Sequence, residues 1–462
     1  MNRKAMTMQK IFLVFLFCIF IGTFAEASLF DVNTEVSDGS KVSVSKDISD
    51  SASTSKKEPK KTNIFTKVAK TIKKAAVSAK DAIKNGASSV KAKAESKIDN
   101  IFDKKPKFVA QSYKIPGHDD KKFVCQGITY LSDRVISPAS AQKTQNSYPY
   151  TVLSFYPTKN TTKPSQLVVL NAKTGKALCR FDLYQTENTP YTGHAGGITL
   201  AGEFIWAASG NKIYGFDTKT IIDFTTDDTA QKPATRPTGI PKSLNLPYKK
   251  LVAKAIYETD SKASFVSFDG KYLWVGDFVK SSNDSYAPIA HHKSEPFNRS
   301  TWISGYLTDS KGMPTSKTAY DYKTGDSVKK GHKPDAVICC RESVQGMSVC
   351  DDYIALSISY GANNSKLAFY KNPLSEKGTT ISYKPEGQSK TYKTTGYELS
   401  DAKNWVETVS IAAGSEDLDF DGKYLYVTFE GGSPNYKPRW SLNPLVNIEE
   451  DYYLIEIDKI VN

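Results

Sequence analysis

The octet FDGKYLWV, residues 268–275, returns almost unchanged as FDGKYLYV at residues 420–427, 152 positions further along the chain. An Asp-Gly pair between two apolar runs is a strong signal for a β-hairpin, because its turn needs positive φ angles. Three other stretches align with these octets: YLSDRVIS (130–137), LAGEFIWA (200–207) and VCDDYIAL (349–356). The sixth position is always aliphatic: Val135, Ile205, Leu273, Ile354 and Leu425.

Each octet lies inside a longer unit with the features of an antiparallel meander. A short strand of small residues precedes it: CQGITYL, AGGITL, ASFVSF, VQGMSV and SEDLDF. A β-rich run follows it, at residues 166–172, 211–217, 301–307, 366–372 and 452–458. In the first unit, NAKTGKALCRFDL adds a further hairpin and so a fourth strand. The repeating unit is therefore predicted to be a four-stranded antiparallel sheet.

Five such units in succession predict an all-β, five-bladed β-propeller, because each sheet exposes faces that only its neighbours can cover. The equivalent positions are spaced by 70, 68, 81 and 71 residues: Gly127, Gly197, Phe265, Gly346 and Asp417. Five intervals of this size fill residues 111–462, within a propeller domain predicted over residues 106–462. Six blades are the alternative, because the longest interval contains a stretch without assigned strands, residues 277–343.

The chain resembles the β-propeller superfamily in its secreted form without WD repeats. The resemblance covers about three quarters of the chain and rests on the blade pattern and the F-D-G-K-Y-L turn. It extends to secreted bacterial propeller proteins with similar blade starts, here GHAGG (193–197) and VQG (344–346). These motifs are specific for architecture and weak for activity.

A ring of residues is predicted at one end of the propeller channel, because innermost strands line that channel. The position before each aligned residue is Gln126, Gly196, Ser264, Gln345 or Glu416. The four polar members, Gln126, Ser264, Gln345 and Glu416, are the candidate ligand-binding residues. Oxygen ligands in such a ring could hold a hard cation such as Ca²⁺. The alternative is a water-filled channel lined by small polar groups.

The calcium hypothesis also draws on a weaker similarity, to five-bladed apyrase-like nucleotidases. Those proteins place a calcium ion in such a ring by means of several carboxylates and serines. The similarity implies Ser264 and Glu416 as candidate metal ligands. Gln126, Gly196 and Gln345 depart from those residue types, which weakens both the calcium ion and nucleotidase activity as predictions.

Acid–base chemistry at the channel mouth is a second hypothesis, with His194, Glu416 and Asp417 as candidate catalytic residues and Arg341 and Glu342 nearby. A structural role is the alternative for His194, because no second histidine has an equivalent place in another unit. The long insert holds His291 and His292, and no G-x-S-x-G, H-E-x-x-H or phosphate-loop motif occurs.

Three loop aromatics could stack on sugar rings or pack on a partner: Tyr148, Tyr436 and Trp440.

The first 105 residues have a different composition from the predicted propeller. Residues 1–27 combine Arg3, Lys4 and Lys10 with an apolar run and AEA, which predicts a signal peptide and a secreted or periplasmic protein. Residues 28–61 are rich in Ser and Lys, which predicts disorder. Residues 62–105 repeat apolar residues at a mean step of 3.7 from Ile64 to Ile101, opposite lysines, which predicts a basic amphipathic helix.

The positive charge of the chain is concentrated in this leader. Residues 51–110 hold 16 Lys against 5 Asp and Glu, whereas the total net charge is +13. Such a helix could lie on an anionic membrane or polymer, or it could be a solvated spacer. Few arginines and aromatics argue against nucleic acid.

The mature chain would hold five cysteines, an odd number, in an oxidising compartment. Cys340 and Cys350 lie close enough in sequence for a local disulfide. Cys125 and Cys179 fall on the inner and outer strands of one blade, about 14 Å apart, which is too far to bridge.

Closure of the ring needs a strand from outside the last unit, because the chain stops after the third strand of that unit. KFVAQSYKI, residues 107–115, precedes the first blade and is β-rich. We expect it to pair beside residues 452–460 as the outer strand of the last blade.

Two functions remain open from the sequence. The favoured one is a binding module whose partner is a protein, a glycan or a small molecule. The alternative is a secreted hydrolase at the channel mouth, with or without calcium. A ring with three or more carboxylates would favour the enzyme, and this ring has one, Glu416.

Overall fold

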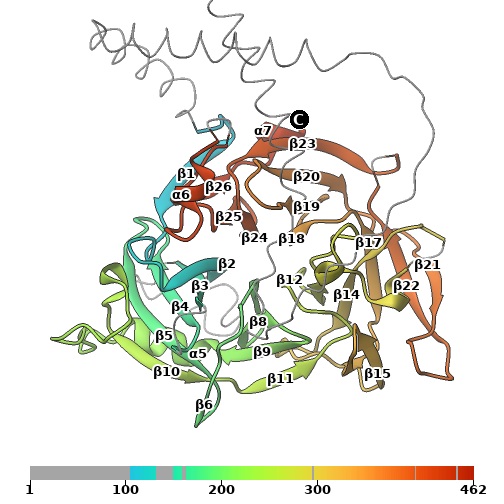
Figure 1. The fold of residues 1–462 in the computed structure, drawn as a ribbon, viewed down its shortest axis with the longest axis horizontal. Helices are drawn as coiled ribbons and strands as arrows, with labels where there is room; N and C mark the ends of the chain where they lie inside the picture. The colour runs from blue at the N-terminus through green and yellow to red at the C-terminus, as the bar shows by residue number, and fades with distance from the viewer. Residues whose placement is uncertain (1–104, 132–148, 159–162, 294–295, 401, 444–445) are drawn as a thin grey trace, which may run out of the picture. The chain divides into compact units, whose positions relative to one another are not determined.

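The computed structural model describes residues 105–131, 149–158, 163–293, 296–400, 402–443 and 446–462. The predicted signal peptide, the Ser/Lys-rich segment and residues 62–104 of the leader lie outside these ranges. Residues 105–462 form one unit in which five sheets are arranged as a ring, a five-bladed β-propeller (Figure 1). The predicted fold class is confirmed, with five blades rather than six.

The innermost strands coincide with the five predicted small-residue strands and lie nearest the centre of the ring (Figure 1). They are β2 (Phe123–Leu131), β7 (Ile198–Ala201), β12 (Phe265–Phe268), β18 (Val344–Cys350) and β24 (Ser415–Phe420). The second strands are β3 (Tyr150–Pro157), β8 (Phe204–Ser209), β13 (Tyr272–Gly276), β19 (Tyr353–Ile358) and β25 (Leu425–Phe429).

The third strands coincide with the predicted β-rich runs. They are β4 (Gln166–Asn171), β9 (Lys212–Asp217), β14 (Thr301–Leu307), β20 (Ser365–Lys371) and β26 (Asp451–Ile455). The fourth strands are β5 (Ala177–Thr186), β11 (Ala255–Glu258), β17 (Ala336–Cys340), β23 (Trp405–Ile411) and β1 (Val109–Lys114). The predicted four-stranded antiparallel unit is therefore present in every blade.

Two blades are extended beyond four strands. In the first blade, β10 (Tyr248–Val252) pairs in parallel with β5, and β6 (Thr189–Pro190) also pairs with β5. In the third blade, β22 (Tyr392–Glu398) pairs in parallel with β17, and β21 (Thr379–Tyr383) follows it. The unassigned stretch 277–343 supplies strands to this blade and a separate hairpin of β15 (Ala319–Thr324) and β16 (Ser327–His332), so it forms no sixth blade.

Short helices connect the strands. The α-helices among the described residues are α5 (Thr218–Thr225), α6 (Lys437–Trp440) and α7 (Asp458–Val461). The 3-10 turns are η1 (Lys242–Leu244), η2 (Asp284–Tyr286) and η3 (Ala290–His292). Within the described part of the chain, we find no helix with the length and apolar character that crossing a membrane requires.

The repeated octet closes the hairpins of the third and fifth blades. Gly270 and Gly422 have φ angles of 91° and 90°, which glycine adopts without strain. Asp269 Oδ1 accepts hydrogen bonds from two backbone amides of its turn, and its Oδ2 accepts one of 2.8 Å from Trp274 Nε1. Tyr426 makes the corresponding bond, 3.1 Å, to Asp421. The octet recurs because the aspartate holds both the turn and the aromatic residue of the second strand.

In the first octet, YLSDRVIS, the second half was wrongly predicted to begin the second strand of its blade. The strand that pairs with β2 is β3, in which Thr151 lies opposite Tyr130, as Leu273 lies opposite Phe268 in the third blade. Thr151 of β3 therefore holds the position that the alignment gave to Val135. A long connection can replace a tight turn because closure entropy grows slowly with loop length. Residues 132–148, including Tyr148, lie outside the described residues.

Glycine in the inner strands permits close approach of neighbouring blades. A Cβ on Gly127 would lie 2.9 Å from the backbone nitrogen of Ile198 in the second blade, and one on Gly346 would lie 2.7 Å from the carbonyl oxygen of Glu416 in the fifth. These distances are too short for any larger residue without a shift of the strands. The Gln-Gly starts of the first and fourth blades thus follow from crowding at the centre of the ring.

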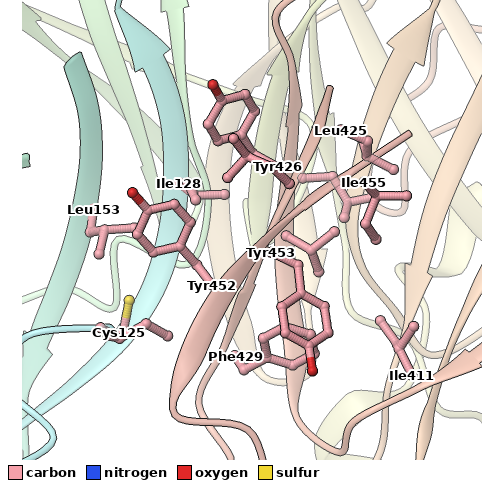
Figure 2. Packing of buried hydrophobic residues seen from close by; sticks show 14 of the residues in the cluster. Cys125, Ile128, Leu153, Ile411, Leu425, Tyr426, Phe429, Tyr452, Tyr453 and Ile455 are labelled. Carbon is pink, nitrogen blue, oxygen red and sulfur yellow. The ribbon is translucent and has the colours of Figure 1, made fainter. Parts of the chain in front are cut away.

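The largest hydrophobic cluster packs the first, fourth and fifth blades together. Ile128 and Leu153 of the first blade lie beside Tyr452 of the last blade (Figure 2). Each of these side chains is fully buried, and burial of one such residue contributes about 1.5–3 kcal/mol. The apolar faces of the blades therefore join the two ends of the propeller.

Closure occurs as predicted, with β1 as the outer strand of the last blade. The strand β1 pairs antiparallel with β26, from Val109 opposite Ile455 to Lys114 opposite Asp451. Figure 1 shows β1 beside β26, although the two strands come from opposite ends of the unit.

The cysteines form no local bridge. Cys340 and Cys350 are both buried free thiols, and they pack into different hydrophobic clusters. The suggested disulfide between them is therefore absent. Cys125 on β2 and Cys179 on β5 are also free, as expected for residues on the first and fourth strands of one blade.

Candidate functional site

A cavity of about 570 Å³ opens where the inner strands converge. All five residues of the predicted ring line it: Gln126, Gly196, Ser264, Gln345 and Glu416. They reach it because they hold equivalent positions near the same end of the inner strands. His194, Tyr436 and Trp440, which the sequence singled out for other roles, also line it. The structure thus brings together residues that are as many as 314 positions apart.

Two carboxyl groups meet in the wall of this cavity. Glu416 lies in β24, and Glu430 directly follows β25 of the same blade. Each carboxyl group acts on the other at close range, which favours one proton on the pair over two negative charges. Glu416 is only 3% exposed, so the pair is largely shielded from bulk water while it faces the cavity.

Neutral hydrogen-bond donors hold the carboxyl pair in place. Gln345 Nε2 donates to Glu416 Oε1 at 3.4 Å, and Gln126 Nε2 donates to Glu430 Oε2 at 3.0 Å. The Tyr436 side chain is also hydrogen-bonded to Glu430, and its hydroxyl lies 3.2 Å from that of Tyr156. The two glutamines of the predicted ring therefore position the carboxyl groups.

The environment of the pair disfavours two negative charges. Burial, followed by the charge of Glu430, raises the pKa of Glu416 well above its usual value. Burial raises the pKa of Glu430 to about 7, although hydrogen bonds from Tyr436 and Gln126 favour its ionised form. One shared proton near neutral pH gives the cavity a hydrogen-bond donor and an acceptor side by side.

Aromatic rings surround the carboxyl pair. Tyr436 and Trp440 lie with their ring centroids 5.0 Å apart, and Tyr156 stacks on His194 at 4.2 Å. On the third blade, Phe278 packs edge-on against Tyr286. Tyr360, which follows β19 of the fourth blade, is 43% exposed at the cavity. Flat apolar faces next to polar groups are suited to ligands that have both a ring face and hydrogen-bonding edges.

The helix α6 carries Trp440 and Arg439 to the cavity. Its N-cap residue is Tyr436, and Pro438 lies in its first turn. Gly414 has a φ of 73°, and a Cβ there would lie 2.9 Å from the Trp440 ring. Lys262 of the third blade supplies a second cationic side chain to the lining.

Asp417, expected at the channel mouth, is not part of the cavity lining. It is fully buried, and its Oδ2 accepts hydrogen bonds from the backbone amides of Ile128 and Ile198, at 3.1 and 2.9 Å. Alternation along β24 directs Asp417 between the blades when Glu416 faces the cavity. Glu342 also lies outside the cavity lining, where it is hydrogen-bonded to Ser281 and Ser300. Arg341 is also absent from the lining.

The candidate calcium ligands Ser264 and Glu416 both line the cavity, and Glu430 adds a second carboxyl group. Carboxylate and hydroxyl oxygens suit Ca²⁺. The raised pKa values of the two glutamates favour a proton where a cation would bind. Calcium would therefore have to compete with that proton, and its binding stays a prediction.

Sequence reasoning missed Glu430 and Tyr156. Both belong to second strands, at or beyond the end of the repeated pattern, so the alignment of inner strands could not include them. A signal was available in the fifth unit, where VTFEGG places a carboxylate after the second strand. Only the ring geometry shows that this end faces Glu416.

Comparisons with known proteins give no family for the chain. No protein-family model and no curated protein sequence matches it. A glutaminyl cyclase from Myxococcus xanthus is similar in structure, with 6% identity, coverage of 77% of this chain and 97% of that chain, and a TM-score of 0.32. Regucalcin, a calcium-binding protein from Agrobacterium tumefaciens, is similar with 12% identity, coverage of 77% of this chain and 95% of that chain, and a TM-score of 0.28. The Hadza microbial sialidase Hz136 is similar with 10% identity, coverage of 76% of this chain and 69% of that chain, and a TM-score of 0.26. At these scores the likenesses carry no argument about function.

Proposed function

We propose that the chain is a recognition protein whose central cavity binds a small polar molecule with a ring face, such as a sugar. The buried Glu416–Glu430 carboxyl pair in the cavity wall, held by Gln345 and Gln126, is the observation that carries this proposal. A protonated carboxyl donates while its ionised neighbour accepts, which matches the hydroxyl and amide groups of such a ligand. Tyr360 and Tyr436 offer the flat surfaces for its ring.

Acid–base hydrolysis at the same pair is the second candidate. The pKa of about 7 for Glu430 favours it, because a catalytic group works best when its pKa lies near the working pH. In that case Glu430 takes a proton from water and Glu416, which holds its proton more strongly, donates one to the leaving group. His194 is less suited to this role, since its ring stacks on Tyr156 rather than contacting the pair.

Secretion and surface attachment complete the proposal. The support is the sequence alone: an apolar N-terminal run followed by AEA, and a lysine-rich helical pattern over residues 62–105. In this proposal the leader holds the propeller near an anionic membrane or polymer, and the cavity meets ligands outside the cytoplasm.

A binding screen tests the recognition function. Thermal shift of the full chain against monosaccharides, disaccharides and amino acids is expected to reveal stabilising compounds, whose affinities are then measured by calorimetry. Glu430→Gln and Tyr360→Ala should weaken binding at least tenfold. Trp405→Ala, which removes an exposed aromatic residue outside the cavity lining, should not. Equal binding by all variants would contradict the site.

A turnover assay separates the two candidates. The chain is incubated with nitrophenyl glycosides, esters and phosphates, and product release is followed. Turnover abolished by Glu416→Gln would support the hydrolase, whereas binding without turnover supports recognition.

A further inference from the structure

A second cluster of chemically active side chains lies in the third blade, away from the carboxyl pair. The side chains of Asp260, His291 and His292 each offer one ligand atom, and these atoms all lie within 4.8 Å of one another. The three side chains are between 0% and 2% exposed. No member of this trio lines the central cavity.

Two separate segments bring the trio together. Asp260 follows β11 at the passage from the second to the third blade, and the histidines belong to η3 in the long insert. The His292 ring stacks on Trp302 of β14 at 4.7 Å, and the His291 ring stacks on Tyr383 of β21 at 5.5 Å. These aromatic contacts fix both imidazoles with their Nε2 atoms toward Asp260.

The distances within the trio are close to those of a metal site. His292 Nε2 lies 3.5 Å from Asp260 Oδ2, and ligands of tetrahedral zinc lie about 3.4 Å apart at bond lengths of about 2.0–2.1 Å. His291 Nε2 lies 2.8 and 3.0 Å from the two Asp260 oxygens, which are hydrogen-bond distances that a bound ion would lengthen. Two imidazoles and one carboxylate form a ligand set that suits divalent transition metals.

The far side of His292 has the partner that metal-ligating histidines need. Its Nδ1 lies 3.7 Å from Asp277 Oδ2. Asp277 is itself held, since its Oδ1 accepts hydrogen bonds from the Ser261 hydroxyl at 2.6 Å and from the backbone amide of Lys262. A carboxylate behind the non-ligating nitrogen orients the imidazole and makes it a better ligand. The Tyr320 hydroxyl supports Asp260 in the same way, at 2.7 Å.

A second observation points independently to a ligand. Both ring nitrogens of His292 are buried without a hydrogen-bond partner, and so is Asp277 Oδ2. Buried polar groups nearly always have partners, because their desolvation is otherwise uncompensated. Coordination at Nε2 would satisfy one nitrogen and draw Nδ1–H toward Asp277.

We propose that Asp260, His291 and His292 bind a divalent transition metal, zinc being the expected ion, with Asp277 and Tyr320 as the residues that orient the ligands. The ion would join the insert that carries η3 to the junction of the second and third blades. Lys262 and Phe278 line the central cavity and directly follow Ser261 and Asp277, so the ion would also stabilise that part of the cavity wall.

Metal content of the full chain is the first test. After dialysis into metal-free buffer, elemental mass spectrometry should find one equivalent of zinc or another divalent transition metal per chain. Removal with phenanthroline should lower the melting temperature, and Zn²⁺ alone should restore it, whereas Mg²⁺ and Ca²⁺ should not. A chain without such a metal, whose melting is also unchanged by added Zn²⁺, would overturn the proposal.

Variants then locate the ion. His292→Asn should abolish retention of the metal and the melting response to Zn²⁺, and Asp277→Asn should weaken zinc binding about 10–100-fold. His194→Gln removes an exposed histidine outside the trio and should change neither. If His292→Asn fails to fold, the proposal is tested on the wild-type chain and on the milder variant Asp277→Asn. For both, the melting temperature is measured after removal of the metal and after addition of Zn²⁺. Full zinc retention by a folded His292→Asn would place the ion elsewhere.

Discussion

Tyr113 lies directly opposite Tyr452 in the last blade, with ring centroids 5.6 Å apart, although 339 residues separate them. The pairing joins the first strand of the propeller to its last, so the ring has no open edge at this blade. Deletion of residues 1–116 should therefore destabilise the whole propeller, whereas deletion of residues 1–104 should leave its unfolding unchanged. Chemical denaturation followed by circular dichroism compares the two truncations. Equal midpoints would contradict closure by β1.

Asp417 connects three inner strands, because it belongs to β24 and accepts hydrogen bonds from amides of β2 and β7. Asp417→Ala leaves these two buried amides without an acceptor, which should cost about 2–4 kcal/mol in the free energy of unfolding. Asp417→Asn keeps one acceptor oxygen and should cost less. Urea unfolding measures both variants. A loss below about 1 kcal/mol for the alanine variant would show that the amides find other partners.

Glu430 should make stability depend on pH. Burial raises its folded-state pKa to about 7, above the value of an unfolded glutamate, so the folded chain binds the extra proton. This contribution to stability is complete below about pH 4.5 and is lost as the pH rises through 7. In Glu430→Gln the fall in melting temperature between pH 5 and 8 should be smaller than in the wild type.

The matched control for this prediction is Glu386→Gln, which removes an exposed glutamate paired with Lys323 outside the cavity. Its pH profile should follow that of the wild type. Asp419 has a pKa raised to about 6 by burial, so it contributes a fall of the same sign to every profile. Only the difference between variants reports on the Glu416–Glu430 pair. Identical profiles for wild type and Glu430→Gln would show that Glu430 is ionised throughout.

Calcium should distinguish a cation site from a carboxyl pair that shares a proton. If Glu416 helps to bind calcium, the ion should raise the melting temperature of the wild type and not that of Glu416→Gln. The effect should grow from pH 6 to pH 8, as the competing proton leaves. Melting curves that coincide in calcium and in chelator, for the wild type at both pH values, would exclude the ion from this site.

Local patterns accounted for most of the architecture. The Asp-Gly turns at 269–270 and 421–422, the period-2 strands around them and their even spacing predicted five blades, and the strand left over predicted closure by residues 107–115. The same spacing placed Gln126, Gly196, Ser264, Gln345 and Glu416 in one ring. These features are readable because turn chemistry and strand alternation act over a few neighbouring residues and repeat in each blade.

Tertiary structure alone decided the chemistry of the ring and of the third blade. Glu430 meets Glu416 only because β24 and β25 lie side by side with their ends at the cavity, and Asp417 faces the other way. A long connection to β3 replaced the expected tight hairpin, and β22 joined β17 in parallel with paired residues 59 positions apart. Asp260 meets His291 and His292 through an irregular insert. The sequence determined where strands turn and repeat, whereas the encounter of distant polar groups depends on how whole blades pack, which no local pattern encodes.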